Sequence, residues 1–428
     1  MRWRIHGGRV IDPASGYDGN AEVWVEDHLI LAVGAAPRGL KADQSIDARG
    51  LIVSPGFVDL GSHLREPGFE RKASIASEAR AAAAGGFTTV CCTPDTSPVI
   101  DNPTVVEHIT QSAAAAGGAQ VLCLGALTVG LAGEVLAEMH ALKRAGVVGI
   151  TNLERAIKDT AVLKHALAYA ASAELTVFLR SEDYWLSRDG LVHEGPVSTR
   201  LGLNGIPAAA EVIAVYRDLI LVAAAGARAH FCKLSAADSI KPIAQARARG
   251  LPVSADVSLA NLCFTEDNLG NFDPNFHLRP PLRASSDRKA LRQGIKTGAI
   301  DAISASHEPH DADAKAAPFG LTEPGISSVD TFLPALLGLV AAGAFDLPTA
   351  IAAASLRPHR ILGRAGGEII PGAPADLCLF DPTRRWQATV AELASAGKNT
   401  PYLDAHLTGK VVLTMVGGQV VHRLAGSV

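Results

Sequence analysis

The middle of the chain alternates short apolar runs with alanine-rich stretches, and this alternation is the strongest constraint on its fold. The alanine-rich stretches, such as residues 75–84 and 103–116, have the composition of helices. The apolar runs are short and bounded by turn residues, as buried strands are. Eight strands that alternate with helices predict a parallel (β/α)8 barrel. The eight predicted strands are Val53–Leu60, Phe87–Cys92, Val121–Gly125, Gly149–Thr151, Thr176–Leu179, Ala229–Leu234, Val253–Val257 and Ala302–Ala305.

The two ends of the chain differ from the middle because both are rich in strand-like runs and turns. Residues 1–54 contain the runs Gly8–Asp12 and Ala21–Val25, and the last part of the chain contains Lys410–Val416 and Gln419–His422. We therefore expect residues 1–54 and 366–428 to form one small β-sandwich domain. Residues 55–365 then form the barrel.

Composition limits the classes of function. With 428 residues, of which 48% are hydrophobic and 19% charged, the chain can bury a large core. The formal net charge of -4 argues against nucleic acid or an anionic membrane as a partner. The start of the chain lacks the apolar segment of a signal peptide, and no apolar run is long enough to span a membrane. We expect a cytoplasmic protein whose six cysteines, which form no C-x-x-C pair, are reduced thiols.

The first predicted strand leads into the most specific motif of the chain, Pro55-Gly-Phe-Val-Asp-Leu-Gly-Ser-His-Leu-Arg65. This stretch resembles the Pro-Gly-Phe-Val-Asp-x-His-x-His signature of the metal-dependent amidohydrolases. The continuation Leu64-Arg-Glu-Pro-Gly68 narrows the resemblance to dihydroorotase. The resemblance extends over nearly the whole chain, through Gly86–Pro94, Val197–Pro207, Arg279–Arg283, Gly325–Ser327, Pro371–Leu377 and Lys398–Pro401.

The resemblance implies a metal site that this sequence does not preserve. Dihydroorotases open or close a cyclic amide with zinc, which activates water and polarises the carbonyl group, and with an aspartate that moves a proton. The family places these ligands after strands one, four, five, six and eight of its barrel. Only His63 is kept. The other ligand positions hold Gly61, Asn152, Arg180, Lys233 and Ser306.

Arg180 and Lys233 bring positive charge to the place where the resemblance expects a dication. A guanidinium group stays protonated, and a lysine must lose its proton before it can bind a metal. Because buried cations need acidic partners, we predict an ion-pair cluster in the barrel mouth with Glu182, Asp183 and Asp95. We expect no catalytic residue, metal or other cofactor at these positions.

The positions that hold the substrate in the family are only partly kept. Arg65, which in the family grips the substrate carboxylate, and His310 are retained. Asp95 replaces an asparagine and would repel a carboxylate, and Arg279 replaces another asparagine. Arg65 has an equally good structural interpretation, as a residue that stabilises the barrel.

A rearranged metal site is a further possibility that the residues leave open. His63 alone is better explained as a hydrogen-bonded barrel residue than as a ligand. His63, His230, Cys232 and Asp256 together offer ligands of the right types. We disfavour this site because His230 and Cys232, as alternate strand residues, point together, whereas Lys233 should point the other way.

Two functions follow from the resemblance. The first is a catalytically inactive, dihydroorotase-like protein of pyrimidine biosynthesis. Some bacteria have such homologues, which assemble with the catalytic chain of aspartate transcarbamoylase and are needed for that enzyme's stability or activity. We then expect an oligomer. The alternative is an active dihydroorotase, or a related cyclic amidase, in which zinc occupies a rearranged site.

Overall fold

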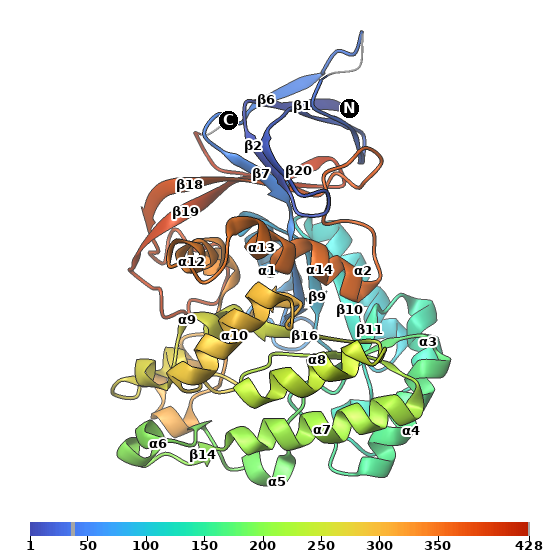
Figure 1. The fold of residues 1–428 in the computed structure, drawn as a ribbon, viewed down its shortest axis with the longest axis vertical. Helices are drawn as coiled ribbons and strands as arrows, with labels where there is room; N and C mark the ends of the chain where they lie inside the picture. The colour runs from blue at the N-terminus through green and yellow to red at the C-terminus, as the bar shows by residue number, and fades with distance from the viewer. Residues whose placement is uncertain (36–38, 427–428) are drawn as a thin grey trace.

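A computed structural model describes residues 1–35 and 39–426 of the protein. It shows a barrel wrapped by helices, with a β-rich domain at the end that carries both termini (Figure 1). The short helices that follow strand β12 lie at the opposite end of the molecule. No helix in the described part of the chain is long and apolar enough to cross a membrane.

The barrel strands form a parallel sheet of eight, in the order β17-β16-β15-β12-β11-β10-β9-β8. All eight predicted strands are confirmed, with ends shifted by a few residues. They are β8 Phe57–Ser62, β9 Phe87–Cys92, β10 Gln120–Ala126, β11 Gly149–Thr151, β12 Thr176–Leu179, β15 Arg228–Phe231, β16 Val253–Ser258 and β17 Ala302–Ser304.

A buried carboxylate links the first and last strands of the barrel. Asp59 on β8 accepts the backbone N–H groups of Ala305 at 2.8 Å and Ser306 at 3.1 Å, directly after β17. Just after the end of β8, the N–H of His63 donates to the carbonyl oxygen of His307 at 2.8 Å. These bonds hold the end of β8, which carries the Gly61–Arg65 segment, against the loop that follows β17.

The prediction of one strand over Val53–Leu60 is wrong in one respect, because the chain divides there into two strands. β7 Ile52–Pro55 belongs to the β domain and β8 to the barrel. Gly56 lies between them, where a Cβ atom would sit 2.1 Å from the Thr88 side chain. Only glycine fits this close approach, and the chain changes sheets at this residue.

Helices cover the outside of the barrel. Helix α1 (Ile75–Ala84) begins with a capping box, in which Ser74 and Ser77 each bond the other's backbone N–H. The long helix α7 (Ala208–Ala225) ends at Gly226, whose φ of 64° is left-handed. The other helices are α2 Pro103–Ala116, α3 Met139–Ala145, α4 Thr160–Ser172, α5 Tyr184–Ser187, α6 Pro196–Leu201, α8 Ile240–Ala248, α9 Leu259–Cys263, α10 Ser285–Thr297, α11 Asp313–Ala316, α12 Val329–Ala341, α13 Leu347–Ile351 and α14 Arg357–Leu362.

Both ends of the chain build the β domain, as predicted. A six-stranded sheet has the order β20-β19-β18-β7-β2-β3, and a four-stranded sheet has the order β5-β4-β1-β6. Side chains of both sheets share one apolar core, which includes Val23 and Leu413. The strands are β1 Arg2–His6, β2 Arg9–Asp12, β3 Tyr17–Asn20, β4 Val23–Glu26, β5 Leu29–Val33, β6 Gln44–Asp47, β18 Leu377–Gln387, β19 His406–Val416 and β20 Gln419–Arg423.

The segment between β18 and β19 returns to the barrel. Asn399 donates to the carbonyl oxygen of Glu308 at 3.0 Å, and its own side-chain oxygen accepts the N–H of His310 at 2.8 Å. Ser395 donates to the buried Glu78 carboxylate at 2.6 Å. Residues 388–405 therefore brace the loop after β17, which carries Glu308 and His310.

Candidate functional site

Four of the five altered ligand positions meet around one small cavity at the carboxyl ends of the barrel strands. The centre of a water molecule can occupy about 30 Å³ of it, which is room for only a few waters. Its polar lining consists of Thr93, Thr151, Glu154, Arg180, Lys233, Asp256, Ser304 and Ser306, together with Gly61 and the thiol of Cys232. Asn152 does not line it.

Arg180, directly after β12, lies in this cavity as a paired cation. Its guanidinium group is 2.9 Å from Glu182 and 3.2 Å from Glu154, and its side chain is only 4% exposed. Glu182 also accepts a hydrogen bond from Arg279 at 2.5 Å. Arg279, which the resemblance places at a substrate position, is therefore engaged by a carboxylate of its own chain.

Lys233 shares one of these carboxylates. Its ammonium nitrogen lies 3.3 Å from Glu154, which thus bridges Lys233 and Arg180. The expectation that Lys233 points away from Cys232 is wrong, because both side chains line the cavity. β15 ends at Phe231, and Lys233 has a left-handed φ of 54°, so the alternation of strand side chains no longer applies.

The charges of this cluster stabilise one another. Burial alone would raise the pKa of Glu182, but the charges of Arg180 and Arg279 lower it to about 2. Burial opposes the charge of Lys233, yet the carboxylates of Glu154 and Glu308 raise the pKa of its ammonium group. Glu182 and Lys233 are therefore both ionised near neutral pH.

The predicted ion-pair cluster exists, but two of its predicted members are wrong. Asp183 instead caps helix α5, where its carboxylate accepts the N–H of Leu186 at 3.0 Å. Asp95 instead pairs with His63. Glu154 takes their place, and sequence analysis missed it because Leu153, with a φ of 51°, turns the loop after β11 inward. The available signal was an acidic residue next to a lost ligand position.

The three remaining altered positions have different surroundings. The Asn152 side chain accepts from Thr128 at 2.7 Å and donates to the carbonyl oxygen of Arg155 at 2.8 Å, so it fixes its own loop. Gly61 leaves open space, since a Cβ atom there would meet only the Thr93 side chain, at 3.8 Å. Ser306 shares a hydrogen bond of 2.9 Å with Ser304.

A second cluster surrounds the retained family residues. His63 Nδ1 lies 2.7 Å from Asp95, and the guanidinium group of Arg65 lies 3.2 Å from Glu308 and 3.8 Å from Asp95. Arg65 also donates to the carbonyl oxygen of Pro309 at 3.0 Å. The group expected to grip a substrate carboxylate is therefore held by a carboxylate of its own chain.

Electrostatics in the second cluster follow from burial and charge. Burial would raise the pKa of Glu308, but the charges of His63, Arg65 and Lys233 lower it to about 2. Burial and the charge of Arg65 lower the pKa of His310 to about 4. His310 is therefore neutral near pH 7, and it accepts from Lys72 at 3.3 Å while its Nε2–H donates to the carbonyl oxygen of Pro324 at 2.9 Å.

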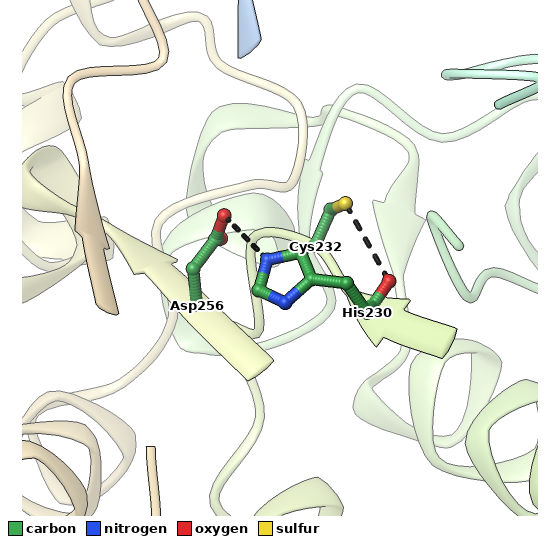
Figure 2. A group of neighbouring side chains, drawn as sticks. All are labelled: His230, Cys232 and Asp256. Carbon is green, nitrogen blue, oxygen red and sulfur yellow. Dashed lines mark hydrogen bonds and ion pairs between the residues drawn. The ribbon is translucent and has the colours of Figure 1, made fainter. Parts of the chain in front are cut away.

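A third group lies on the wall of the barrel interior. His230 lies on β15, Cys232 directly follows this strand and Asp256 lies on β16, and their possible ligand atoms are within 4.8 Å of one another (Figure 2). His230 is already hydrogen-bonded at both ring nitrogens, to Asp256 at 3.1 Å and to Ser254 at 2.8 Å. Burial raises the pKa of the Cys232 thiol well above its ordinary value. His63 is not part of this group.

The residues at the family's ligand positions do not fit a zinc ion. Glycine offers no ligand, and Arg180 and Lys233 place two cations on either side of Glu154. Within residues 1–35 and 39–426, the Nε2 atom of His63 is buried without a hydrogen-bond partner, and the Glu308 carboxylate lies 4.0 Å from it. One unpartnered nitrogen does not make a dication site, because tight zinc binding needs three or four ligands.

Comparisons with known proteins agree with the fold and with the motif. Residues 50–239 match the dihydro-orotase-like family, and residues 199–421 match the amidohydrolase family. A dihydroorotase-like protein of Pseudomonas aeruginosa is 46% identical over 422 residues, which cover 99% of this chain and 100% of the relative. A dihydroorotase of Geobacter sp. (strain M21) is 41% identical over 426 residues, which cover 99% of this chain and 100% of the relative.

Solved structures support the same architecture. An L-hydantoinase (dihydropyrimidinase) from Arthrobacter aurescens superposes with a TM-score of 0.88 and covers 100% of this chain and 97% of its own. A dihydropyrimidinase from Brevibacillus agri gives a TM-score of 0.83, and the match covers 99% of this chain and 95% of that structure's chain. Both are 21% identical to this chain, so the likeness concerns the fold alone.

Proposed function

The chain belongs to the dihydroorotase-like proteins of the amidohydrolase family, and from this premise we propose that it is a catalytically inactive member. In this account it acts as an assembly partner of aspartate transcarbamoylase in pyrimidine biosynthesis. The barrel serves as a rigid framework, and the former metal pocket is filled by the protein's own charges.

The observation that carries the proposal is the ion-pair cluster of Arg180, Lys233, Glu154 and Glu182. Two cations occupy ligand positions, and each has a carboxylate within 3.3 Å. The cavity that remains holds a few waters, whereas sites for small molecules usually measure several hundred Å³. The site thus lacks both the metal ligands and the room for a cyclic substrate.

The substrate positions support the same interpretation. Arg65 is 8% exposed and already bonded to Glu308 and Pro309, and Arg279 is bonded to Glu182. A substrate carboxylate would have to displace Glu308 from Arg65 and would meet the charge of Asp95. Both steps are unfavourable, because an ion displaced from its partner in a buried place loses several kcal/mol of stabilisation, roughly three to five.

An exposed apolar face supports a role in protein association. On α7, Ile213, Tyr216 and Ile220 are 51, 54 and 68% exposed, and their spacing places them on one side of the helix. Trp185 on the adjacent helix α5 is 65% exposed. Exposed apolar side chains gathered on one helix face suit a surface for protein association.

Co-purification tests the partnership directly. The tagged protein is captured from its own cells at physiological salt, and the captured chains are identified by mass spectrometry. The proposal expects the catalytic chain of aspartate transcarbamoylase in a fixed ratio, and expects loss of that chain when Tyr216 and Ile220 are replaced by aspartate. The matched control is Val390→Asp, another exposed apolar position, which lies in the loop between β18 and β19 and is 57% exposed. Capture of this protein alone would contradict the proposed partnership.

The lack of activity is tested separately. Purified protein, alone and with the transcarbamoylase, is assayed for interconversion of carbamoyl aspartate and dihydroorotate. The proposal expects no turnover above a Lys233→Ala, Arg180→Ala control. Turnover that these two substitutions abolish would show that the charged cluster is itself catalytic.

A second candidate function is a cyclic amide hydrolase with a rearranged zinc site. The group of His230, Cys232 and Asp256 favours it, since their possible ligand atoms lie within 4.8 Å and their types suit zinc. Cobalt titration distinguishes the two candidates because a cobalt–thiolate bond absorbs visible light. The second candidate expects an absorption band that Cys232→Ser removes, and the first expects none.

A further inference from the structure

A second and larger cavity lies at the opposite end of the barrel, among the amino ends of the strands. Its volume is about 440 Å³, against about 30 Å³ for the cavity at the mouth. The first residues of β12, β15 and β16 form its floor, and α8 and α14 supply its sides. Its lining consists of Thr176, Arg228, Ala229, Arg247, Leu251, Pro252, Val253, Ser254, Asp301, Arg357, Arg360 and Ile361.

The charge of this lining is strongly unbalanced. It contains four arginines and, among the described residues, one carboxylate, that of Asp301. Arg247 is paired with Asp301 at 2.7 Å and also donates to the carbonyl oxygen of Gly298 at 3.0 Å. The Asp301 carboxylate also accepts the N–H of Ala255 at 2.8 Å, so little of its hydrogen-bonding capacity remains for the other arginines.

The other three arginines have no carboxylate partner within residues 1–35 and 39–426. Arg357 donates only to the backbone carbonyl oxygen of Asp301, at 3.3 Å, and Arg228 only to that of Glu174, at 3.4 Å. Arg360 makes no side-chain hydrogen bond or ion pair there. It lies three residues after Arg357, on the same face of α14. Burial lowers the pKa of Arg357; the charge of Asp301 opposes this shift, and the charges of Arg360 and Arg247 add to it.

We propose that this cavity binds a small molecule that carries a phosphate group, held by Arg357, Arg360 and Arg228. The planar guanidinium fork matches phosphate oxygens and binds them in pairs. The apolar side chains of Leu251, Pro252 and Ile361 provide a surface for the organic part of the ligand. The cavity volume falls within the usual range for small-molecule sites, which favours a small ligand over a polypeptide.

The arginine cavity is separate from the mouth cavity, on which the proposed loss of catalysis rests. It lies at the amino ends of β12, β15 and β16, and the former metal pocket lies at their carboxyl ends. One chain of hydrogen bonds connects the two ends, because Ser254 lines the arginine cavity and bonds His230, which bonds Asp256 in the mouth. A ligand could bind here whether or not the protein has hydrolase activity.

Isothermal titration of the full chain tests the proposal with two probes, inorganic phosphate and phenyl phosphate, at constant ionic strength. We expect one site per chain, with phenyl phosphate binding about tenfold more tightly because its ring contacts the apolar wall. Equal affinities would assign the site to free phosphate. Failure of both probes to bind would overturn the proposal.

Substitutions locate the binding. The double variant Arg357→Gln, Arg360→Gln should weaken phenyl phosphate binding about tenfold or more, since it removes two charge-assisted contacts. Arg228→Gln, at an exposed residue, gives an independent test that does not depend on the folding of α14. The matched control is Arg249→Gln, an exposed arginine directly after α8 that does not line the cavity. Equal loss in the control, or loss only with Arg279→Gln at the mouth, would contradict the assignment.

Discussion

The two ends of the barrel both gather cationic side chains, but they neutralise them in different ways. At the carboxyl end, Arg180, Lys233 and Arg279 each lie within 3.3 Å of a carboxylate from their own chain. At the amino end, Arg357 and Arg360 have no such partner in the described part of the chain, and a cavity of about 440 Å³ separates them from the facing strands. Charge that is satisfied internally stabilises a fold, whereas charge left unsatisfied in a cavity is available to a ligand.

Restoring the family's ligands at the mouth should produce the largest change. The combined substitutions Gly61→His, Arg180→His, Lys233→His and Ser306→Asp remove two cations and free Glu154, while Glu182 keeps its pairing with Arg279. We expect the variant to retain zinc through gel filtration, measured by elemental mass spectrometry, while the unaltered protein does not.

Asn152 provides the matched comparison for this variant. Its side chain fixes its own loop and does not line the cavity, so adding Asn152→Asp should change the zinc content little. If only the variant with Asn152→Asp retained zinc, the loop after β11 would have to rearrange, and our description of the mouth would be incomplete.

Removing the bridging carboxylate should have the next largest effect. Glu154→Gln leaves Arg180 with one carboxylate and Lys233 with none in direct contact. We expect the free energy of unfolding to fall by about 2–4 kcal/mol, measured by urea denaturation. Glu174→Gln, which removes the exposed partner of Lys143, should lower it by about 0.5 kcal/mol or less. Equal effects of the two substitutions would mean that the mouth cluster is no more stabilising than a surface pair.

Much of this architecture is predictable from sequence, and the exceptions have physical causes. The strands and the composite β domain follow from apolar patterns that are local in the chain. The altered ligand positions follow from motif alignment. The partners of those residues do not, because Glu154 and Lys233 reach the cavity through left-handed residues in their loops. No local pattern encodes such turns for residues other than glycine.

The arginine cavity escaped sequence analysis for a different reason. Its four arginines come from β15, α8 and α14, which are far apart in the chain and carry no shared motif. Each arginine alone is typical of a solvated surface. Only the closed barrel brings them together, and only the structure shows that one of the four is paired.

Acid should weaken the charged clusters at the mouth. The folded-state pKa of Glu182 and of Glu308 is about 2, below the ordinary value of 4.5. A carboxylate with a depressed pKa stabilises the fold above its unfolded-state pKa, and this contribution disappears as pH falls through the folded-state value. We expect the melting temperature to fall between about pH 4.5 and pH 2. Glu182→Gln should make that fall shallower, and an unchanged pH profile in this variant would contradict the pairing.

The link between the two ends should show the smallest effect. Ser254→Ala removes the hydroxyl group that bonds His230 at the edge of the arginine cavity. We expect a loss of about 1 kcal/mol in the free energy of unfolding, typical of one hydrogen bond. The control is Ser172→Ala on the exposed face of α4, for which we expect a smaller loss. A much larger loss at Ser254 would show that the mouth cluster depends on the amino end.

The most direct test of the account is the metal content of the unaltered protein. It is purified without chelator from zinc-supplemented culture, and zinc per chain is measured by elemental mass spectrometry after gel filtration. The account predicts a value near zero, because cations paired with Glu154 and Glu182 occupy the ligand positions. A value near one or two per chain that survives gel filtration would contradict it and make the hydrolase with a rearranged site the leading explanation.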